Sequence, residues 1–295
     1  MSLGGGHPNV PLPEPAPLEG SRRSRILGGG GSSGSRGVAI AIVSTGVFFT
    51  VLVVLVLNSP GWPEVRRSFF NGRIFVDSLP GILDGFRTNV FAFLIAEAFI
   101  LLFALFIAVL RSLPGPVFFP VRALAVVYTD LFRGVPTILV IYILGFGAPG
   151  LGLQIPKTPM FWGIVGLVLV YSAYVAEVYR AGIESVHPSQ VSAARSLGLT
   201  RWKALRFVVI PQAVRRVVPP LLNDFIGLQK DTALLAVIGV LEAFRRSQVA
   251  TSGAFNYTPY LATALLFVLI TIPLARLTDW LIARERRRRQ AGVVA

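Results

Sequence analysis

The side chains that usually carry out covalent or metal chemistry are scarce in this chain. Its 295 residues include no cysteine and only two histidines, His7 and His187. A thiol nucleophile, a disulfide and a cysteine-bound zinc are therefore excluded, and so few histidines do not indicate a metal site. No Gly-x-x-x-x-Gly-Lys-Ser/Thr run is present, so the chain itself is not expected to bind ATP phosphates. We expect no catalytic, cofactor-binding or metal-binding residue, and a non-enzymatic protein.

The polar side chains that suggest a function lie inside long apolar runs instead. One run ends in residues 171–183, which contain Tyr174, Glu177 and Arg180. In a helix Tyr174, Glu177 and Ala181 share a face, and a bare carboxylate facing lipid costs several kcal/mol. Glu177 should therefore point into protein, with Arg180 as its nearest ionic partner. Tyr174 and Glu177 are candidates for a substrate path.

A second polar run, residues 223–234, reads Asn-Asp-Phe-Ile-Gly-Leu-Gln-Lys-Asp-Thr-Ala-Leu. Amides, hydroxyls and charges inside a membrane either line a translocation path or hold helices together through buried hydrogen bonds. Asp231 can pair with Lys230 or with a neighbouring helix. Both interpretations stay open, and the candidate path residues of this run are Asn223, Gln229, Lys230, Asp231 and Thr232.

A third polar run, residues 128–136, reads Tyr-Thr-Asp-Leu-Phe-Arg-Gly-Val-Pro. Gly134 and Pro136 predict a bend, because proline has no N–H to donate to the carbonyl four residues earlier. Asp130 and Arg133 are three residues apart and can neutralise one another as a structural ion pair. We interpret Arg133, Gly134 and Pro136 as structural residues.

The most polar internal stretch of the chain is residues 189–211. His187 or Ser189 can cap a short helix here, and Gly198 suits the left-handed residue that ends one. Thr200 can cap a second helix that follows directly. The pattern predicts a helix, a glycine corner and another helix.

The same stretch has the properties of a docking surface for another protein. The small residues Ala193 and Ala194 would let a partner approach the backbone closely, while nearby cations stay in water. Pro211 breaks or bends the helical pattern at its end. An ordinary loop lying on the membrane surface is the alternative interpretation.

The composition places these runs in a membrane. Hydrophobic residues make up 54% of the chain and its mean hydropathy is +0.68. The formal charge of +14 is therefore attributed to the positive-inside bias and to anionic lipid, and not to nucleic acid. Six segments near the roughly 20 residues that cross a bilayer are predicted to be transmembrane helices: 38–58, 87–110, 122–147, 160–180, 214–243 and 259–282. The fifth of these segments contains Pro219 and Pro220 and is expected to be broken or to line a cavity.

The ends of the chain differ from its apolar middle. Residues 1–37 are rich in Gly, Pro, Ser and Arg and are predicted to be a disordered basic tail. The run at 38–58 lacks a small-residue cleavage site and is predicted to be a retained anchor, followed by an external loop at 59–85. Residues 284–295 are a second basic tail. The distribution of Arg and Lys places both termini and residues 181–211 in the cytoplasm.

Two of these runs resemble signatures of the permeases of polar amino-acid ABC importers, the histidine/glutamine type. Residues 171–183 resemble Tyr-Ser-Ala-Tyr-x-Ala-Glu-x-x-Arg-x-Gly-Ile, and residues 228–234 resemble Leu-x-Lys-Asp-Thr-Ser-Leu. Residues 132–136 are similar to the Phe-Arg-Gly-Thr-Pro motif, with Val135 replacing threonine. The resemblance covers about residues 86–283, and its motifs occur in the right order.

Residues 189–211 resemble the Glu-Ala-Ala signature of ABC-importer permeases, with the same spacing to Gly198 and Pro211. Ser192 stands where the family has glutamate, which removes one docking contact. In the family this segment is the coupling helix that enters a cleft of the ATPase subunit. The resemblance assigns ATPase coupling to a short set of residues: Ser192, Ala193, Ala194, Arg195, Leu197 and Gly198.

The resemblance also implies the fold and the partners. It implies an all-α polytopic bundle of about six transmembrane helices. Five of these form a type I importer core like that of methionine importers (residues 86–283), and an N-terminal accessory span precedes them. Partner ATPase subunits would bind ATP and Mg²⁺, a second permease chain would complete the path, and an extracytoplasmic binding protein would deliver the amino acid. The location would be the bacterial plasma membrane.

Other classes of protein remain as alternatives. An ion-coupled secondary transporter or channel would need no ATPase and no docking stretch between Ala193 and Gly198. A membrane enzyme would need an acid–base or metal cluster that the chain does not offer. Methionine-, betaine- or sulfate-type permeases share the implied fold, but the runs at 171–183 and 228–234 favour amino acids.

Overall fold

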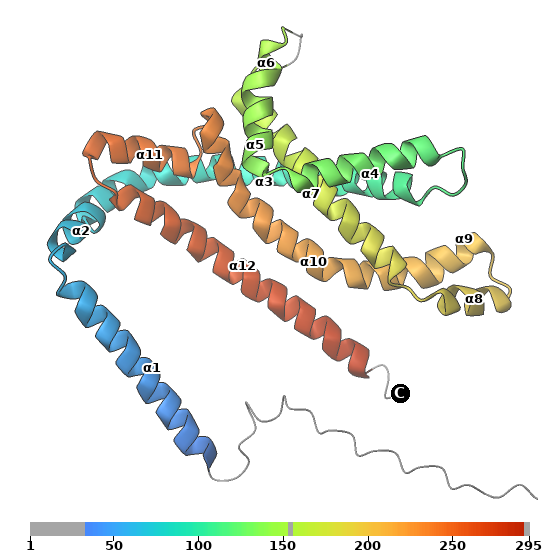
Figure 1. Cartoon of the computed structure of the whole chain (residues 1–295), viewed down its shortest axis with the longest axis horizontal. Coiled ribbons are helices and arrows are strands. Elements are labelled where there is room, and N and C mark those ends of the chain that lie inside the picture. Colours follow the sequence, from blue (N-terminus) through green and yellow to red (C-terminus); the bar gives the residue numbers. More distant parts are fainter. Residues whose placement is uncertain (1–32, 153–155, 292–295) are drawn as a thin grey trace, which may run out of the picture. The chain divides into compact units, whose positions relative to one another are not determined.

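The computed structural model describes residues 33–152 and 156–291 (Figure 1). Contacts divide the chain into two units, Met1–Pro63 and Glu64–Ala295, and each is described by itself. The described residues form helices and no strand, which confirms the all-α fold predicted from the sequence.

The first unit contains one helix, α1 (Ser33–Leu57). Its apolar side chains are exposed along its length, and the part at Gly37–Leu57 is long and apolar enough to cross a membrane. The helix begins at Ser33 and not at residue 38, because one more helical turn costs little once a helix is nucleated. The rest of the predicted tail, residues 1–32, lies outside the described residues.

The boundary between the units falls inside α2 (Trp62–Phe69), and the second unit continues with the 41-residue helix α3 (Gly72–Ser112). Most of the predicted external loop at 59–85 is therefore helical. The reason is local, because the side chain of Asn71 accepts hydrogen bonds from the backbone N–H groups of Arg73 and Ile74 at 3.1 and 3.2 Å. This N-cap starts the helix fifteen residues before the apolar segment that the sequence predicted.

The chain then turns back through α4 (Phe119–Gly134) and α5 (Thr137–Tyr142), which meet at an angle of 104°. The bend lies at Gly134 and Pro136, as the sequence predicted. Beyond α5 the chain continues through a π-helical turn, Ile143–Gly147, into α6 (Ala148–Gly150).

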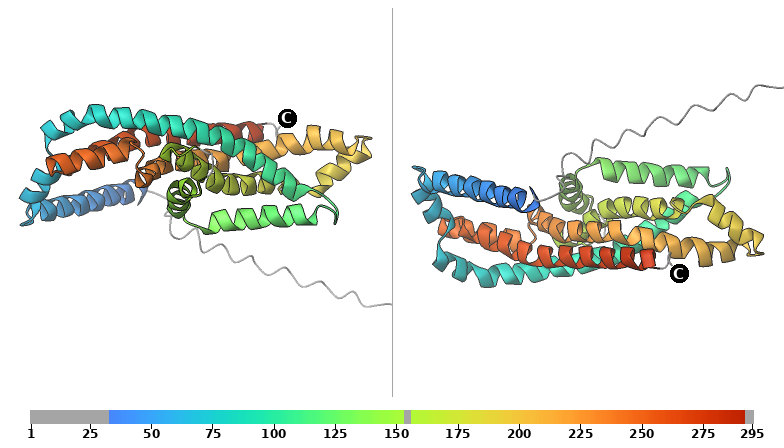
Figure 2. Two further views of the ribbon diagram at one scale, coloured as in Figure 1. Left: turned by 90° about the horizontal axis from the view of Figure 1, so that it is seen from above. Right: turned by 90° about the horizontal axis from the view of Figure 1, so that it is seen from below.

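The remaining long helices run back and forth along this unit (Figure 2). Helix α7 (Pro159–Glu184) leads to the two short helices α8 (Pro188–Ser196) and α9 (Arg201–Ala204), and α10 (Ile210–Asp231) returns from them. A 3₁₀ turn, Thr232–Ile238, leads to α11 (Ala243–Ala254), and the long α12 (Thr258–Ala291) ends the described chain. Figure 1 shows α8 and α9 at one end of this unit and α11 at the other.

Among the described residues, four helices are long and apolar enough to cross a membrane, or five if the bent pair α4–α5 counts as one span. The predicted segment at 214–243 is not among them. Its polar residues lower its hydropathy, and it is divided between α10 and the 3₁₀ turn, which ends at Gly239 with φ 88°. The broken character expected of this segment is therefore present.

The core of the second unit forms where α3 crosses α7. Small side chains on both helices let them approach closely, and Ala92, Ala96, Ala173 and Ala176 are fully buried there. Close approach also occurs between α3 and α11. A Cβ built on Gly85 would lie 2.7 Å from the backbone nitrogen of Ala243, so only glycine fits this contact.

Candidate functional site

The loop between α7 and α10 has the local structure that its sequence predicts. His187 caps α8, because its Nδ1 accepts a hydrogen bond from the Ser189 N–H at 3.2 Å. Gly198 follows the helix with φ +84°, the left-handed conformation expected of it. Thr200 caps α9, and its hydroxyl accepts from the Lys203 N–H at 3.3 Å.

The surface of α8 differs from the expectation at one residue. Ser192, Ala193, Arg195 and Gly198 are exposed, whereas Ala194 is 5% exposed. One helical turn before Ala194, Val191 packs against Val186, Val209 and Ala213, so this face of α8 is turned toward its own chain. Ala194 is therefore covered by its own chain and supports α8 from behind.

Large apolar side chains stand out from this loop. Leu197, Trp202 and Phe207 are 84%, 65% and 63% exposed. The cations Arg201 and Lys203 are exposed beside them. Exposed apolar groups among cations at a loop between helices are typical of a protein-binding surface.

A helical turn and a hydrogen bond connect the loop to α7 and α10. The predicted break near Pro211 is a π-helical turn, Leu205–Val209, which joins α9 to α10 without ending the helical path. Such a turn accommodates the proline, which has no N–H to donate. The Arg216 guanidinium on α10 donates a hydrogen bond to the Ser185 carbonyl at the end of α7. Helices α7 and α10 are thus tied together next to α8.

Glu177 lies at the centre of an ionic cluster from three helices. Its carboxylate pairs with Arg180 at 2.7 Å, as predicted, and also accepts a hydrogen bond from Arg111 of α3. Arg133 of α4 lies 3.9 Å away. The Arg111 guanidinium also donates to the Thr129 hydroxyl at 3.0 Å. One carboxylate therefore joins α3, α4 and α7.

The predicted pair between Asp130 and Arg133 does not form. Asp130 is exposed and makes no ion pair with any described residue. Arg133 lies toward Glu177 instead, and its Cζ is 5.8 Å from the centre of the Tyr174 ring. The Tyr174 hydroxyl in turn donates to the Arg133 carbonyl at 3.3 Å. Tyr174 thus supports the bend between α4 and α5. Tyr174 lies on another helix, so the residue spacing along α4 alone did not indicate this contact.

The polar run at 223–234 is divided between exposed and buried positions. Asn223 and Lys230 are exposed in this chain. Asp231 accepts a hydrogen bond from the Tyr171 hydroxyl of α7 at 2.9 Å, which matches the expected link to a neighbouring helix. Gln229 is 7% exposed, and its side-chain oxygen accepts from the Thr271 hydroxyl of α12 at 3.1 Å.

Thr232 belongs to a buried hydrogen-bond network. It is 0% exposed, as is Glu242, and Asn89 of α3 is 1% exposed. The Asn89 Nδ2 group donates to the Thr232 hydroxyl at 3.1 Å and to the Glu242 carboxylate at 2.9 Å. Glu242 accepts from the N–H groups of Phe244 and Arg245 and so caps α11. Thr232 is therefore buried within the chain and joins α3 to the 3₁₀ turn through hydrogen bonds.

Sequence reasoning did not identify Asn89 or Glu242. Glu242 precedes α11 directly, and an acidic residue before a helix is an N-cap signal that could have been used. Asn89 carries no local signal, because its partners are more than 140 residues away along the chain. Within the part of the chain that the structure describes, no group of three or more His, Asp or Glu side chains could hold a metal ion.

Comparison with known proteins identifies the family. The family described as "Binding-protein-dependent transport system inner membrane component" matches residues 101–287. The probable amino-acid permease protein YxeN of Bacillus subtilis is 33% identical over 206 residues, which cover 69% of this chain and 91% of that protein. The probable glutamine ABC transporter permease protein GlnM of the same organism is 34% identical, over 70% of this chain and 93% of that protein.

Two solved structures of ABC transporters are also similar to this chain. A crystal structure of an amino acid ABC transporter with histidines has 32% identity and a TM-score of 0.65, and covers 71% of this chain and 96% of that chain. An inward-facing structure of the MetNI methionine ABC transporter, at 18% identity and a TM-score of 0.55, shares the fold. It covers 69% of this chain and 95% of that chain.

Proposed function

Because the chain belongs to the family of binding-protein-dependent transport system inner membrane components, we propose that it is the permease subunit of an ATP-driven ABC importer for amino acids. It is a membrane protein and a transport subunit, not an enzyme. ATP hydrolysis belongs to a separate subunit of the importer, which would bind ATP and Mg²⁺. The substrates that fit its relatives and its sequence signatures are polar amino acids.

The exposed α8 helix is the observation that carries the coupling role. We infer that the ATPase subunit docks on Ser192, Ala193, Arg195, Leu197 and Gly198. Leu197 is 84% exposed, and its side chain would insert into an apolar cleft of the partner. Cations beside it suit an acidic rim around that cleft.

The contacts behind α8 suggest how its movement would reach the membrane. Val191 of α8 packs against Val209, the last residue of the π-helical turn, and Ala213 in the first turn of α10. The Arg216 side chain holds the end of α7 to the same helix. A displacement of α8 by the ATPase would therefore move α7 and α10 together. Alternation between inward- and outward-facing states would follow as a shift in the populations of two conformations.

The remaining features of the importer are inferred from the family and from charge. A second permease chain would complete the path, and a binding protein outside the membrane would deliver the amino acid. Both termini and α8 would lie in the cytoplasm of a bacterium, because Arg and Lys gather on that side. Helix α1 would be an accessory anchor outside the permease domain. The candidates for the path stay as the sequence predicted them: Tyr174, Glu177, Asn223, Gln229, Lys230, Asp231 and Thr232.

Purification and transport measurements test this function together. The tagged chain, solubilised gently from its native membrane, should co-purify with a P-loop ATPase in about equal amounts. Reconstituted with that ATPase and its binding protein, it should take up an amino acid only when ATP is present. A chain that purifies alone and transports without ATP would refute the proposal and favour an ion-coupled transporter.

A further inference from the structure

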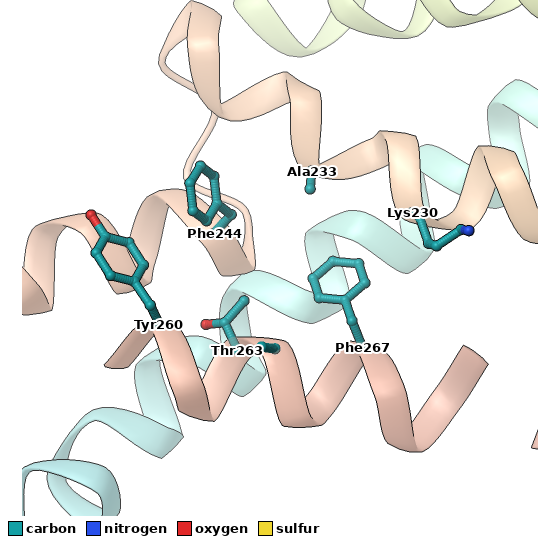
Figure 3. A pocket seen from close by; sticks show the side chains of 7 residues that line it. Lys230, Ala233, Phe244, Tyr260, Thr263 and Phe267 are labelled. Carbon is teal, nitrogen blue, oxygen red and sulfur yellow. The ribbon is translucent and has the colours of Figure 1, made fainter. Parts of the chain in front are cut away.

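One side of α12 packs against its own chain. The Phe267 ring lies edge-on to the Phe86 ring of α3, with ring centres 5.6 Å apart, and the Thr271 hydroxyl donates to Gln229 of α10 at 3.1 Å. Figure 3 shows Phe267 on this side of the helix, turned toward the hollow between α10, α11 and α12. The opposite side of α12 faces away from the helices that it packs against.

This outward side of α12 carries a line of exposed side chains, which we call the α12 stripe. Successive members are three or four residues apart, so they share one face of the helix. The first three members are apolar, and the later ones are cationic or aromatic. The α12 stripe consists of Leu265, Leu269, Ile272, Arg276, Trp280 and Arg284, and it continues to Arg287 one helical turn later; all are exposed.

The apolar part of the α12 stripe has the length of one membrane leaflet. The helix is long and apolar enough to cross a membrane between Thr258 and Arg284. From Leu265 to Arg276 it rises about 16 Å, at about 1.5 Å per residue. Half of a hydrocarbon core of about 30 Å is about 15 Å. An acyl chain lying along the apolar members would therefore bring its headgroup to the arginines.

The arginines of the stripe are available to an anion. The Arg284 Cζ lies 5.2 Å from the centre of the Trp280 ring, and a guanidinium stacked on a ring keeps its N–H groups free for a phosphate. Among the described side chains Arg276 pairs with Asp279 alone, at 3.9 Å, and both are at least 70% exposed, so this pair is weak. No described carboxylate pairs with Arg284 or Arg287.

The sequence around these arginines matches the boundary between hydrocarbon and headgroups. Residues 284–289 read Arg-Glu-Arg-Arg-Arg-Arg, so cations outnumber carboxylates directly after the apolar part of α12. Such clusters next to a transmembrane helix attract anionic lipid headgroups. Trp280 precedes the cluster by one helical turn, and tryptophan is enriched at this depth of a membrane.

We propose that the α12 stripe binds an anionic phospholipid such as phosphatidylglycerol, with an acyl chain along its apolar part and the phosphate at its arginines. The proposal goes beyond the transport function and needs only that α12 crosses the membrane. A soluble anion would make no use of the apolar members, and an acidic protein would not reach them inside the hydrocarbon. A zwitterionic lipid would bring an ammonium group to the arginines together with its phosphate, and like charges repel.

The cysteine-free sequence allows a single fluorescent label beside the stripe. Leu277 is 52% exposed next to Arg276 and is not a member of the stripe, so Leu277→Cys can carry a bimane there. The complete importer is placed in phosphatidylcholine nanodiscs that contain a small fraction of nitroxide-labelled lipid, with either a phosphatidylglycerol or a phosphatidylcholine headgroup. The nitroxide lies on the acyl chain near the headgroup and quenches a bimane that it contacts. Val109→Cys on α3, 50% exposed, is the control, because the nearby Arg111 is engaged by Glu177.

Labelled phosphatidylglycerol should quench the bimane at residue 277 at a lower mole fraction than labelled phosphatidylcholine, by about tenfold, whereas the two lipids should quench the bimane at residue 109 equally. Arg284→Gln with Arg287→Gln should lower this preference by about fivefold or more, because each cation at the headgroups contributes about a fivefold factor. Arg66→Gln with Arg73→Gln removes the same charge from exposed positions outside the stripe and should leave the preference unchanged.

Three results would overturn the lipid site. Equal quenching of the bimane at residue 277 by the two lipids would show that the stripe does not distinguish their headgroups. A preference that Arg284→Gln with Arg287→Gln does not change, or that Arg66→Gln with Arg73→Gln lowers as much, would show that the arginines of the stripe do not produce it. An absence of quenching by either lipid in the complete importer would show that another subunit covers the stripe. ATP-driven amino-acid uptake, measured separately, decides the transport function.

Discussion

Replacing Glu177 with glutamine tests whether the ionic cluster holds the helices together. The substitution keeps the size of the side chain and its ability to accept hydrogen bonds. It removes the negative charge that faces Arg111, Arg133 and Arg180. Arg111 and Arg133 would then lose their carboxylate partner, whereas Arg180 would keep its ion pair with Glu184.

The burial of the cluster sets the size of the effect. The side chains of Glu177 and Arg111 are 15% and 14% exposed, so water replaces little of the lost charge. Removing one partner of a buried ion pair costs about 3–5 kcal/mol, and the retained hydrogen bonds favour the lower end. Because about 1 kcal/mol shifts the melting temperature of a large domain by about 2–4 °C, we expect a loss of about 6–12 °C.

Thermal unfolding of the purified importer complex measures this loss. Glu64→Gln is the matched control, since Glu64 pairs with Arg67 at 3.7 Å while both side chains are more than 70% exposed. An exposed pair contributes about 0–1 kcal/mol, so the control should shift the melting temperature by about 4 °C or less.

A double-mutant cycle with Arg111→Met separates the ionic term from simple packing. Arg111→Met should lower the stability much less in the Glu177→Gln background than in the wild type. In that background the carboxylate is already absent, so the substitution removes a guanidinium that has lost its ionic partner. Equal losses from Glu177→Gln and Glu64→Gln, or additive effects in the cycle, would refute the role given to this cluster.

Three further predictions concern backbone geometry and the buried network, all measured by thermal unfolding of the complex. Gly198→Ala should cost about 1–2 kcal/mol; the whole cost comes from the left-handed φ of +84°, because nothing lies within 4 Å of the added Cβ. Gly253→Ala inside α11 should be neutral or stabilising, and equal effects of the two substitutions would contradict this. Gly85→Ala should cost more, on the order of 3 kcal/mol, because the added Cβ would meet the α11 backbone at 2.7 Å. Gly81→Ala, whose added Cβ meets nothing within 4 Å, should cost nothing. A tolerated Gly85→Ala would show that α11 moves freely. Asn89→Ala should cost about 2–4 kcal/mol, because it leaves the Ala243 N–H without its acceptor and removes the amide hydrogen bond to Glu242, which keeps only its two backbone donors. A loss below about 1 kcal/mol would show that water enters the network.

Local features of this protein were predictable from the sequence because they depend on a few neighbouring residues. His187 and Gly198 determine where α8 begins and ends, and Thr200 determines where α9 begins, through one side-chain hydrogen bond each or one backbone conformation. Gly134 and Pro136 determine the 104° bend for the same reason. The apolar composition determined the membrane class, since it needs no knowledge of contacts at all.

Local signals also failed where two of them competed. The apolar pattern placed the start of the second predicted span at residue 87, but the Asn71 cap starts α3 at Gly72. The sequence spacing paired Asp130 with Arg133, but a carboxylate on another helix attracts Arg133. In both places the stronger interaction was a specific side-chain contact that a hydropathy pattern does not represent.

Only the tertiary structure decided which distant residues meet. Arg111 reaches Glu177 across 66 residues, and Asn89 reaches Glu242 across 153. The burial of Ala194 depends on α8 lying against the beginning of α10, and the outward side of α12 depends on where that helix packs against α3 and α10. The sequence by itself determined the all-α class, the helix ends that depend on local caps, and the family. The partners of each polar side chain follow from which helix faces come together, and every long apolar helix offers several such faces.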